Sequence, residues 1–386
     1  MATRRPEIDI RRTAFALRGY NVTNLGKTAE FVDHHLYGEI LQRHLETASK
    51  ICRQLTGLPT DLVQRVRENQ ETDLGTYAEA VALIVAVEQA QLEILRSFFD
   101  LDFADANFAF GFSLGEISAL IGAGMISLDD GLTVPILMAT DCASLAADVV
   151  LAICFTKQQE INLSLIKKLC LDINEDGDGV IGISAILSPN SVLLMGQRDT
   201  IDRFRKKVGS LDHGRILIRK NDQQWPPLHT PIMWQKNIPC RTAELMHRIK
   251  INEEFHPRVF SLVTGQADYD ALTAREILYR WTERPQRLWD AVCYTLAADV
   301  DTVIHVGPDP NIIPATFKRL ADNVLAQIQH DLRVKAISGM IQRRWISRLL
   351  PRRATLLRAP KIRHIVLEDW LLENQSKATI AVNAMI

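Results

Sequence analysis

The chain has 386 residues, 47% of them hydrophobic and 24% charged, and its formal net charge at pH 7 is -1. This length and composition allow a large buried core, arranged as one large or two smaller domains. A near-zero net charge gives no general attraction to nucleic acid or to an anionic membrane, so we expect neither as a partner.

The cysteines and the apolar segments indicate the cellular compartment of the protein. Six cysteines are scattered without C-x-x-C spacing, which favours buried free thiols over disulfides or a zinc site. Met1–Thr13 is rich in arginine and lacks the apolar stretch of a signal peptide. The most apolar region, Leu132–Phe155, is interrupted by Pro135, Asp141 and Asp148, whereas a membrane-spanning helix needs about 20 mostly apolar residues. We therefore expect a cytoplasmic protein in which Leu132–Phe155 forms buried helix.

The first part of the chain is predicted to begin with a strand and to continue as helices. Thr13–Leu17 is a short apolar run closed by turn-forming residues, which is typical of a strand. Between Leu36 and Phe99, apolar residues recur at helical spacing, so this region is expected to be predominantly helical. Phe108–Phe110 is the next short apolar run and predicts a second, buried strand.

The sequence Gly111-Phe112-Ser113-Leu114-Gly115 follows this second strand and precedes an apolar helix face that includes Ile117 and Leu120. A G-x-S-x-G sequence between strand and helix is a nucleophile elbow, in which the glycines permit a tight turn that exposes the serine Oγ. Free N–H groups at the start of the helix point to the same place and stabilise negative charge on a reacting carbonyl. Ser113 is therefore the candidate nucleophile.

From Phe155 to Gln224 the predicted elements become shorter. Leu169–Ile173, Gly182–Leu187 and Ser191–Met195 are predicted strands. The alternating charged and apolar residues of Asp199–Val208 indicate a surface helix. Elements of this length suggest a small α+β subdomain inserted into a larger one.

One loop of this small subdomain resembles a metal site. Asn174–Ile181 has oxygen-bearing side chains at alternate positions and a turn glycine, like the first half of an EF-hand loop. The twelfth position, however, is Ala185 instead of a bidentate carboxylate, and the flanks look strand-like. A polar turn is favoured over a calcium site, and we expect no bound metal.

Beyond the small subdomain, strands and helices alternate again. Trp225–Pro231 is a proline-framed loop that holds a single histidine, His229. Val259–Val263 and Val303–Val306 are predicted strands, and a helix is predicted from Ile313 to Leu320. This alternation predicts the α/β class, with a mainly parallel sheet and helices on both faces.

Five segments occur in an order and at a spacing that point to one family. They are GFSLGEISALIGAGMISLDDGL (Gly111–Leu132), ILSPNSVLLMGQRDTIDRF (Ile186–Phe204), PLHTPIM (Pro227–Met233), FSLVTG (Phe260–Gly265) and VIHVGPDPNIIPATFKRL (Val303–Leu320). The chain thereby resembles the malonyl-CoA:acyl-carrier-protein transacylase family, the acyltransferases of fatty-acid and polyketide synthesis.

The resemblance implies a division of the chain. It predicts an α/β-hydrolase-like large subdomain with a parallel sheet, over residues 13–154 and 225–323. Inserted into it is a ferredoxin-like small subdomain, over residues 155–224, and the active site lies in the cleft between the two. Residues 324–386 form a C-terminal extension beyond the resemblance.

The resemblance also implies the catalytic residues and the substrates. Ser113 matches the family's nucleophile and His229 its base, with a backbone carbonyl as the usual third member. An imidazole must take the serine proton during attack on a thioester and return it to the departing thiol. The implied oxyanion hole uses the backbone N–H groups of Leu114 and of Tyr20, in the loop Gly19–Thr23 that matches the family's G-Q-G-x-Q. Expected substrates are thioesters of coenzyme A or of an acyl carrier protein's phosphopantetheine, without a bound cofactor.

The acyl pocket departs from the family pattern. The arginine that binds a malonyl carboxylate is expected at about Met138, and no Arg or Lys lies between Gly111 and Thr156. Phe112 replaces the usual histidine before the nucleophile, Leu228 lies in a tetrapeptide that is not of the malonyl type, and Trp281 replaces a glutamine. Because a carboxylate without a partner is costly in a closed apolar pocket, a neutral acyl group is favoured, from acetyl to longer or branched chains.

Three functions fit these residues. The protein is an acyltransferase acting on carrier proteins, an editing hydrolase that releases stalled acyl groups to water, or a non-catalytic relative that binds a carrier protein. The presence of both Ser113 and His229 argues against the third. Transfer and hydrolysis differ in whether water is excluded from the acyl-serine, and the family's usual activity favours transfer.

The C-terminal extension carries a basic amphipathic segment. Arginines within Arg343–Arg353 accompany Ile341, Trp345 and Leu349, which share one helical face. Three roles fit such a helix: packing on the core, steering acidic carrier proteins toward the cleft, or lying on a membrane surface. Packing on the core is favoured. Val366–Leu372 is predicted to pack back on the protein.

Overall fold

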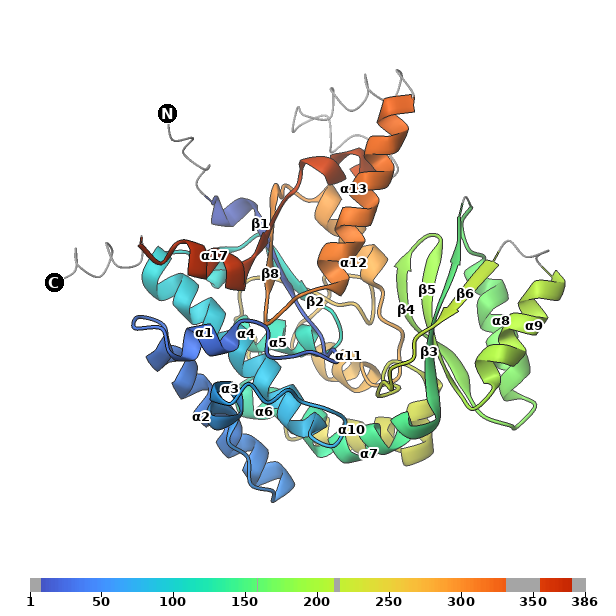
Figure 1. The fold of residues 1–386 in the computed structure, drawn as a ribbon, viewed down its shortest axis with the longest axis horizontal. Helices are drawn as coiled ribbons and strands as arrows, with labels where there is room; N and C mark the ends of the chain where they lie inside the picture. The colour runs from blue at the N-terminus through green and yellow to red at the C-terminus, as the bar shows by residue number, and fades with distance from the viewer. Residues whose placement is uncertain (1–7, 158, 212–215, 331–354, 377–386) are drawn as a thin grey trace.

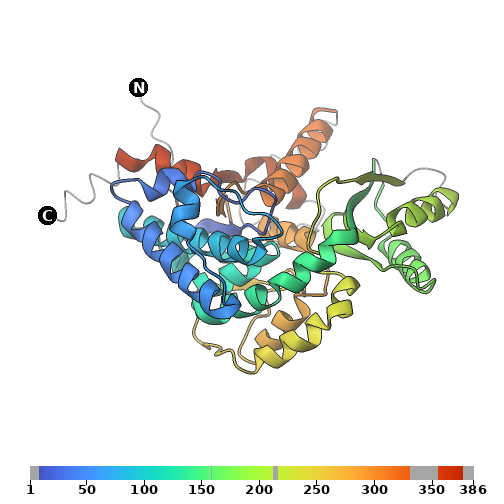
Figure 2. The same ribbon diagram turned by 60° about the horizontal axis from the view of Figure 1, so that its bottom comes forward.

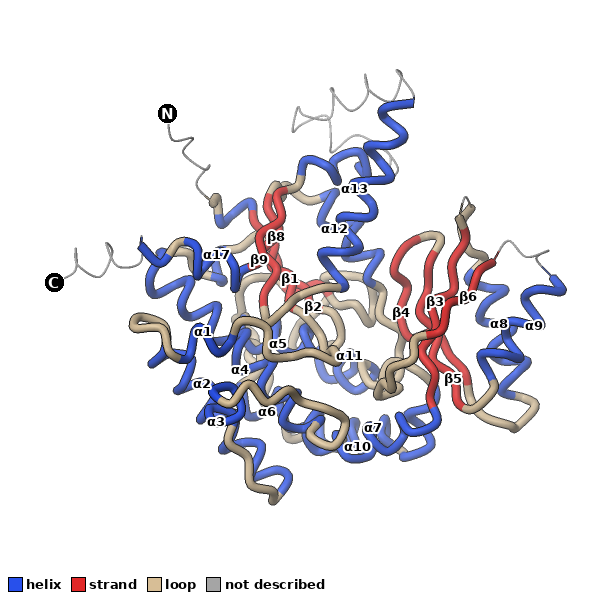
Figure 3. Tube along the Cα trace, viewed as in Figure 1, coloured by secondary structure: helices blue, strands red, loops and turns tan. Residues whose placement is uncertain are grey.

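The computed structural model describes residues 8–157, 159–211, 216–330 and 355–376 and contains two separate β-sheets (Figure 1). One sheet has five strands in the order β7-β2-β1-β8-β9, and the other has four in the order β4-β5-β3-β6. Figure 3 shows the two groups of strands apart from each other, with the four-stranded sheet to one side. The predicted α/β architecture, with a large and a small subdomain, is confirmed.

The five-stranded sheet is parallel throughout. All residues of β1, β2 and β8 are buried, as expected for strands covered by helices on both faces. Leu17, the last residue of β1, pairs with Gly111, the last residue of β2. The loops that follow these two strands therefore leave the sheet side by side. The strands are β1 (Thr13–Leu17), β2 (Phe108–Gly111), β7 (Val259–Phe260), β8 (Thr302–Val306) and β9 (Arg363–Val366).

Helices cover both faces of this sheet, and the residues of β1 alternate between them. Phe15 and Leu17 join a core with α2 and α4, whereas Ala14 and Ala16 join a second core with α12 and α13. The helices of this subdomain are α1 (Thr28–Val32), α2 (Gly38–Thr56), α3 (Leu62–Arg67), α4 (Tyr77–Phe99), α5 (Leu114–Gly122), α6 (Leu128–Leu137), α7 (Ala139–Leu145), α10 (Ile238–Met246), α11 (Ala274–Arg280), α12 (Leu288–Ala297), α13 (Ile312–His330) and α17 (Leu367–Glu373).

The four-stranded sheet is antiparallel and carries two helices on one face (Figure 2). The boundary proposed at residue 155 falls within β3, which pairs with β5 from Val149 onward. The division of the chain at residues 155 and 224 therefore stays a proposal. The elements are β3 (Val149–Thr156), α8 (Leu163–Asn174), β4 (Ile181–Ser188), β5 (Ser191–Gln197), α9 (Thr200–Leu211) and β6 (Ile216–Lys220).

Two local predictions were wrong. Leu169–Ile173 lies within helix α8, whose buried residues Ile166, Leu169, Cys170 and Ile173 recur at helical spacing. A window of five residues is too short to show that period. The region Leu132–Phe155 is helical only in its first part, because its final, largely apolar run pairs with β5 and β6 as strand β3.

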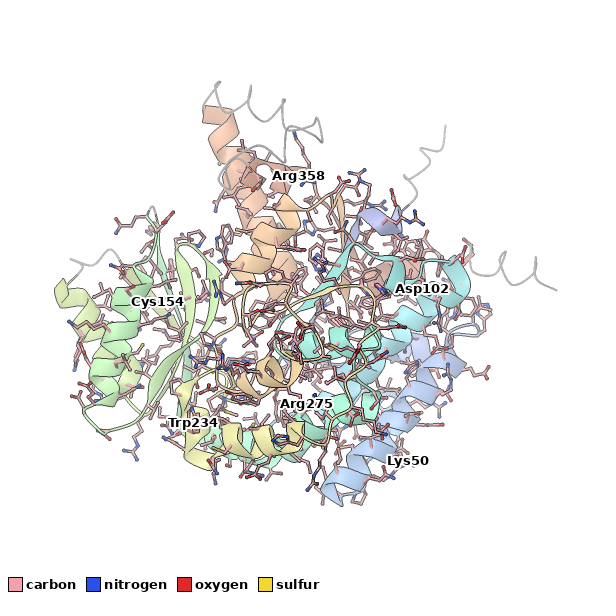
Figure 4. All side chains as sticks on the ribbon, turned by 180° about the vertical axis from the view of Figure 1, so that it is seen from behind. Lys50, Asp102, Cys154, Trp234, Arg275 and Arg358 are labelled. Carbon is pink, nitrogen blue, oxygen red and sulfur yellow. The ribbon has the colours of Figure 1, made fainter. Side chains whose placement is uncertain are left out.

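The C-terminal extension contributes to the large subdomain. The predicted packing of Val366–Leu372 is confirmed, since β9 pairs with β8 and the Trp370 ring lies 4.7 Å from that of Phe99. Arg358, labelled in Figure 4, donates to two backbone carbonyls just after α12, at 2.7 and 2.6 Å. The basic segment 341–353 lies outside the described residues.

The sequence also led to expectations about free cysteines, membrane-spanning helices and a metal-binding loop. All six cysteines are free; four are buried and Cys240 is exposed. Within the part of the chain that the structure describes, no helix has the length and apolarity needed to cross a membrane. In the loop that resembles an EF-hand, Asp176 and Asp178 form ion pairs with Arg203 and Arg198.

Candidate active site

Ser113 lies on a strained turn between β2 and α5. Its backbone has φ 55° and ψ -119°, a conformation that residues other than glycine rarely adopt. A Cβ on Gly111 would lie 1.9 Å from the carbonyl carbon of Gly115, and a Cβ on Gly115 would lie 2.3 Å from the Leu17 oxygen. Both positions therefore require glycine, which explains the G-x-S-x-G sequence of this turn.

His229 is the partner of Ser113. Its Nε2 lies 2.7 Å from the Ser113 Oγ, and its Nδ1 lies 2.7 Å from the backbone oxygen of Trp281. That carbonyl favours the tautomer with the proton on Nδ1, so Nε2 is left to accept the hydroxyl proton. Burial lowers the pKa of His229 to about 4, although the Trp281 carbonyl opposes the shift. The imidazole is thus neutral at pH 7, as a general base must be.

Trp281 contacts the catalytic pair in two ways. Besides its backbone oxygen, its indole N–H donates to the Ser113 carbonyl at 2.9 Å, and its ring meets that of His229 edge-on at 5.2 Å between centroids. The resemblance implied a backbone carbonyl at this point, but sequence reasoning placed only the Trp281 side chain near the site.

Gln286 is a site residue that sequence reasoning missed. It is fully buried, its Oε1 accepts the Ser113 backbone N–H at 3.0 Å, and its Nε2 lies 3.3 Å from His229 Nδ1. A single glutamine in a loop belongs to no motif and carries no periodic signal, so nothing in the sequence distinguished it.

The two residues assigned to the oxyanion hole lie on adjoining segments. Leu114 is the first residue of α5, and Tyr20 follows the end of β1. A Cβ on Gly19 would lie 2.5 Å from the Phe112 oxygen and 3.1 Å from the Ser113 Cβ, so this loop lies directly against the nucleophile. The Tyr20 ring packs edge-on against Tyr77 at 4.8 Å, and burial raises the pKa of Tyr20 to about 12.

Several known proteins are similar to this chain in sequence or in fold. No family model matches the sequence. A malonyl CoA-acyl carrier protein transacylase of Staphylococcus aureus (strain COL) is 24% identical over 281 residues, which are 70% of this chain and 83% of that protein. The protein of the same description in Bacillus subtilis is 22% identical over 220 residues, which are 57% of this chain and only 52% of that protein. The solved structure of the malonyl CoA-acyl carrier protein transacylase from Coxiella burnetii has a TM-score of 0.65 at 17% identity, and the match covers 81% of this chain and 92% of that chain.

In sequence, the chain is similar to malonyl-CoA:acyl-carrier-protein transacylases over more than half of its length. The similarity is distant, at 22% and 24% identity. The structural likeness shows that the fold is shared over most of the described chain.

Buried ionisable side chains hold the loops around the nucleophile in place. Arg18 is buried, and its backbone N–H donates to Glu88 of α4, whose own pKa burial raises to about 8. From the C-terminal extension, the Glu368 carboxylate accepts the backbone N–H groups of Lys27 and Asp309 at 3.0 and 2.8 Å. The Arg18 guanidinium donates to oxygens of Gly19, Thr23, Asn24 and Pro308.

A cavity of about 340 Å³ opens beside Ser113 and His229. Phe112 and Leu228, two of the four residues assigned to the acyl pocket, line it. Its remaining walls come mainly from the four-stranded sheet, the start of α13 and the loop before His229, and include Leu151, Ile153, Leu187, Leu193, Ile312 and Trp225.

The other two residues assigned to the acyl pocket lie elsewhere. Met138 and Trp281 line a separate space of about 10 Å³ beside Ser113, which Leu228 and Tyr77 also border. A single water molecule needs about 10–15 Å³, so this space has no room for an acyl group. Of the four residues, Phe112 lines only the large cavity and Leu228 borders both spaces. Met138 and Trp281 border only the small space.

Proposed function

We propose that this protein is a serine acyltransferase that moves a neutral acyl group from a thioester of coenzyme A or carrier protein to an acyl carrier protein's phosphopantetheine. The observation that supports this most strongly is the 2.7 Å contact between Ser113 Oγ and His229 Nε2, beside a largely apolar cavity. Relatives described as malonyl CoA-acyl carrier protein transacylases support the choice of substrates. The six free cysteines support a reducing, cytoplasmic location.

The reaction has two balanced halves. In the first, His229 takes the proton of Ser113 as its Oγ attacks the thioester carbonyl; the C–S bond then breaks, and His229 returns the proton to the departing sulfur. In the second, His229 takes the proton of the carrier-protein thiol, whose sulfur attacks the acyl-serine. The C–O bond breaks, and the proton returns to Ser113 Oγ.

Each half passes through a tetrahedral oxyanion. We assign its two hydrogen-bond donors to the backbone N–H groups of Leu114 and Tyr20, which come from the α5 start and from the loop after β1. The close approach of Gly19 to Ser113 supports this assignment, because it brings the second loop within reach of a carbonyl bound at the nucleophile.

The walls around Ser113 support a neutral acyl group. Met138, where the resemblance expects a carboxylate-binding arginine, borders a space of about 10 Å³. Two arginines line the large cavity, Arg18 and Arg319. Arg18 is buried with its guanidinium bonded to protein oxygens, whereas Arg319 lies exposed on α13. A malonyl carboxylate held beside Ser113 would therefore lack the bidentate partner that offsets its desolvation.

Two other functions make different use of the same site. An editing hydrolase would transfer the acyl group from Ser113 to water, and a non-catalytic relative would only bind a carrier protein. The 2.7 Å contact between Ser113 Oγ and His229 Nε2 favours catalysis over binding alone, because a base at this distance activates the hydroxyl as a nucleophile.

Intact-protein mass spectrometry tests the proposal. The protein is mixed with acetyl-, longer acyl- and malonyl-CoA and with the corresponding acyl-carrier proteins, and Ser113→Ala serves as the control. We expect an acyl mass on the wild-type chain only, with malonyl-CoA a poorer donor than a neutral acyl-CoA. A clear preference for malonyl would contradict the neutral acyl group. No adduct with any donor, together with unchanged thioester turnover in Ser113→Ala, would contradict the enzymatic function.

A further inference from the structure

Gln286 contacts both members of the catalytic pair. Its Oε1 accepts the Ser113 backbone N–H at 3.0 Å, and its Nε2 lies 3.3 Å from His229 Nδ1. We propose that Gln286 is a positioning residue for acyl transfer, holding the Ser113 backbone in its strained turn and keeping an amide NH₂ group beside the His229 imidazole. This inference rests on the proposed function, because it concerns the same serine and histidine.

The Ser113 N–H fixes the orientation of the Gln286 amide. A backbone N–H only donates, so the atom that faces it must be the amide oxygen, and the NH₂ group must face His229. The reverse orientation would leave the buried Ser113 N–H without an acceptor, which is costly, whereas the His229 Nδ1–H keeps the Trp281 carbonyl as its acceptor in either orientation.

The NH₂ group affects the charge state of His229. The Trp281 carbonyl lies 2.7 Å from Nδ1 and attracts its proton, whereas the Gln286 NH₂ group, at 3.3 Å, presents positive partial charge to the same edge of the ring. The nearer carbonyl sets the tautomer. The amide then disfavours a second proton on the ring, so the imidazole stays a neutral base between turnovers.

The backbone of Gln286 is held by the four-stranded sheet. Its N–H donates to the Ser184 carbonyl at 2.8 Å, and its own carbonyl accepts the Ile186 N–H at 2.8 Å, so that it forms a parallel bridge with Ala185 of β4. Because the side chain is fully buried, it reaches the elbow from a fixed backbone. Gln286 thereby connects the small subdomain to the catalytic pair.

Two substitutions separate the two roles of the amide. Gln286→Glu keeps an oxygen acceptor for the Ser113 N–H but places a carboxylate oxygen beside His229 Nδ1, which favours the imidazolium. Gln286→Leu has a similar length but removes both the acceptor of the Ser113 N–H and the NH₂ group beside His229. Gln223→Glu makes the first change at an exposed position and is the matched control.

The first measurement is the NMR titration of the His229 ring in the wild type, Gln286→Glu and Gln223→Glu, on the full chain. An opposite charge at this distance raises a pKa by about one unit or more. We expect such a rise in Gln286→Glu and none in Gln223→Glu. An unchanged His229 titration in Gln286→Glu would overturn the inference. This measurement needs no substrate, so it decides the role of Gln286 even if no donor acylates Ser113, which would instead refute the proposed function.

The second measurement is the rate of Ser113 acylation as a function of pH. Loss of one buried hydrogen bond predicts a fall of about ten- to a hundredfold in the acylation rate of Gln286→Leu. Because Gln286→Leu also removes the NH₂ group, its acid limb should move toward higher pH, but by less than that of Gln286→Glu. Gln286→Glu is expected to move the acid limb toward higher pH and to retain more of the plateau rate than Gln286→Leu. If both variants show the acylation rate of the wild type and the same acid limb in the pH–rate profile, the inference is overturned.

Discussion

The burial of His229 makes the free energy of unfolding depend on pH. A single substitution at this position isolates its contribution. His229 has a backbone φ of 67°, in the left-handed region where asparagine is also tolerated. His229→Asn therefore removes the titrating ring with little added backbone strain. Other groups titrate equally in both proteins, so the difference between their unfolding free energies reports on His229 alone.

The sign and size of the effect follow from the pKa of His229. It is about 4 in the folded protein, whereas an exposed histidine has a pKa of about 6.5. Between these values the unfolded chain binds a proton that the folded protein does not, so wild-type stability rises with pH through this window. The full effect is roughly 3 kcal/mol, of which about 2.5 kcal/mol develops between about pH 4.5 and about pH 7.5.

Urea unfolding at several pH values measures this dependence. We expect the wild-type unfolding free energy, minus that of His229→Asn, to fall by about 2.5 kcal/mol from about pH 7.5 to about pH 4.5. A difference that stays constant over this range would refute the reasoning, because it would mean that the imidazole accepts a proton as readily in the folded protein as in the unfolded chain.

Two further substitutions test the surroundings of the nucleophile. Gly115→Ala forces a Cβ to within 2.3 Å of a backbone oxygen, so we expect a loss of about 1–3 kcal/mol in chemical unfolding, whereas Gly209→Ala, with nothing within 4 Å, should cause no loss. Glu368→Ala leaves two backbone N–H groups without their acceptor, so we expect a loss of about 1–3 kcal/mol and a slower acylation rate. Asp369→Asn removes only an exposed ion pair and should change stability by less than about 1 kcal/mol. Equal effects of Glu368→Ala and Asp369→Asn would contradict the bracing of these loops.

Features with a local sequence signal could be predicted. The elbow needs glycine on both sides of Ser113 for steric reasons, so its geometry appears as a motif. The strands β1 and β2 are short apolar runs, because both faces of the sheet are covered. The pairing of Ser113 with His229, 116 residues later in the chain, came from the family resemblance and not from the residues themselves.

Features that depend on tertiary contacts could not be predicted. Gln286 belongs to the site only because β4 holds its backbone beside the elbow. Strand β9 is short and carries the polar residues Arg363 and His364, so it lacks the apolar run that marks the other strands. Glu368 lies far from the nucleophile in sequence, and its role follows from the packing of α17 against two loops.

The most direct test of the proposed transfer is a two-step labelling experiment at Ser113. The protein is acylated with a neutral acyl-CoA, freed of excess donor and then mixed with a phosphopantetheine-bearing acyl carrier protein. We expect mass spectrometry to show the acyl group first on Ser113 and then on the carrier protein. Failure to acylate Ser113, or release of the acyl group only as free acid at a rate that does not depend on the carrier protein, would contradict the proposed transfer.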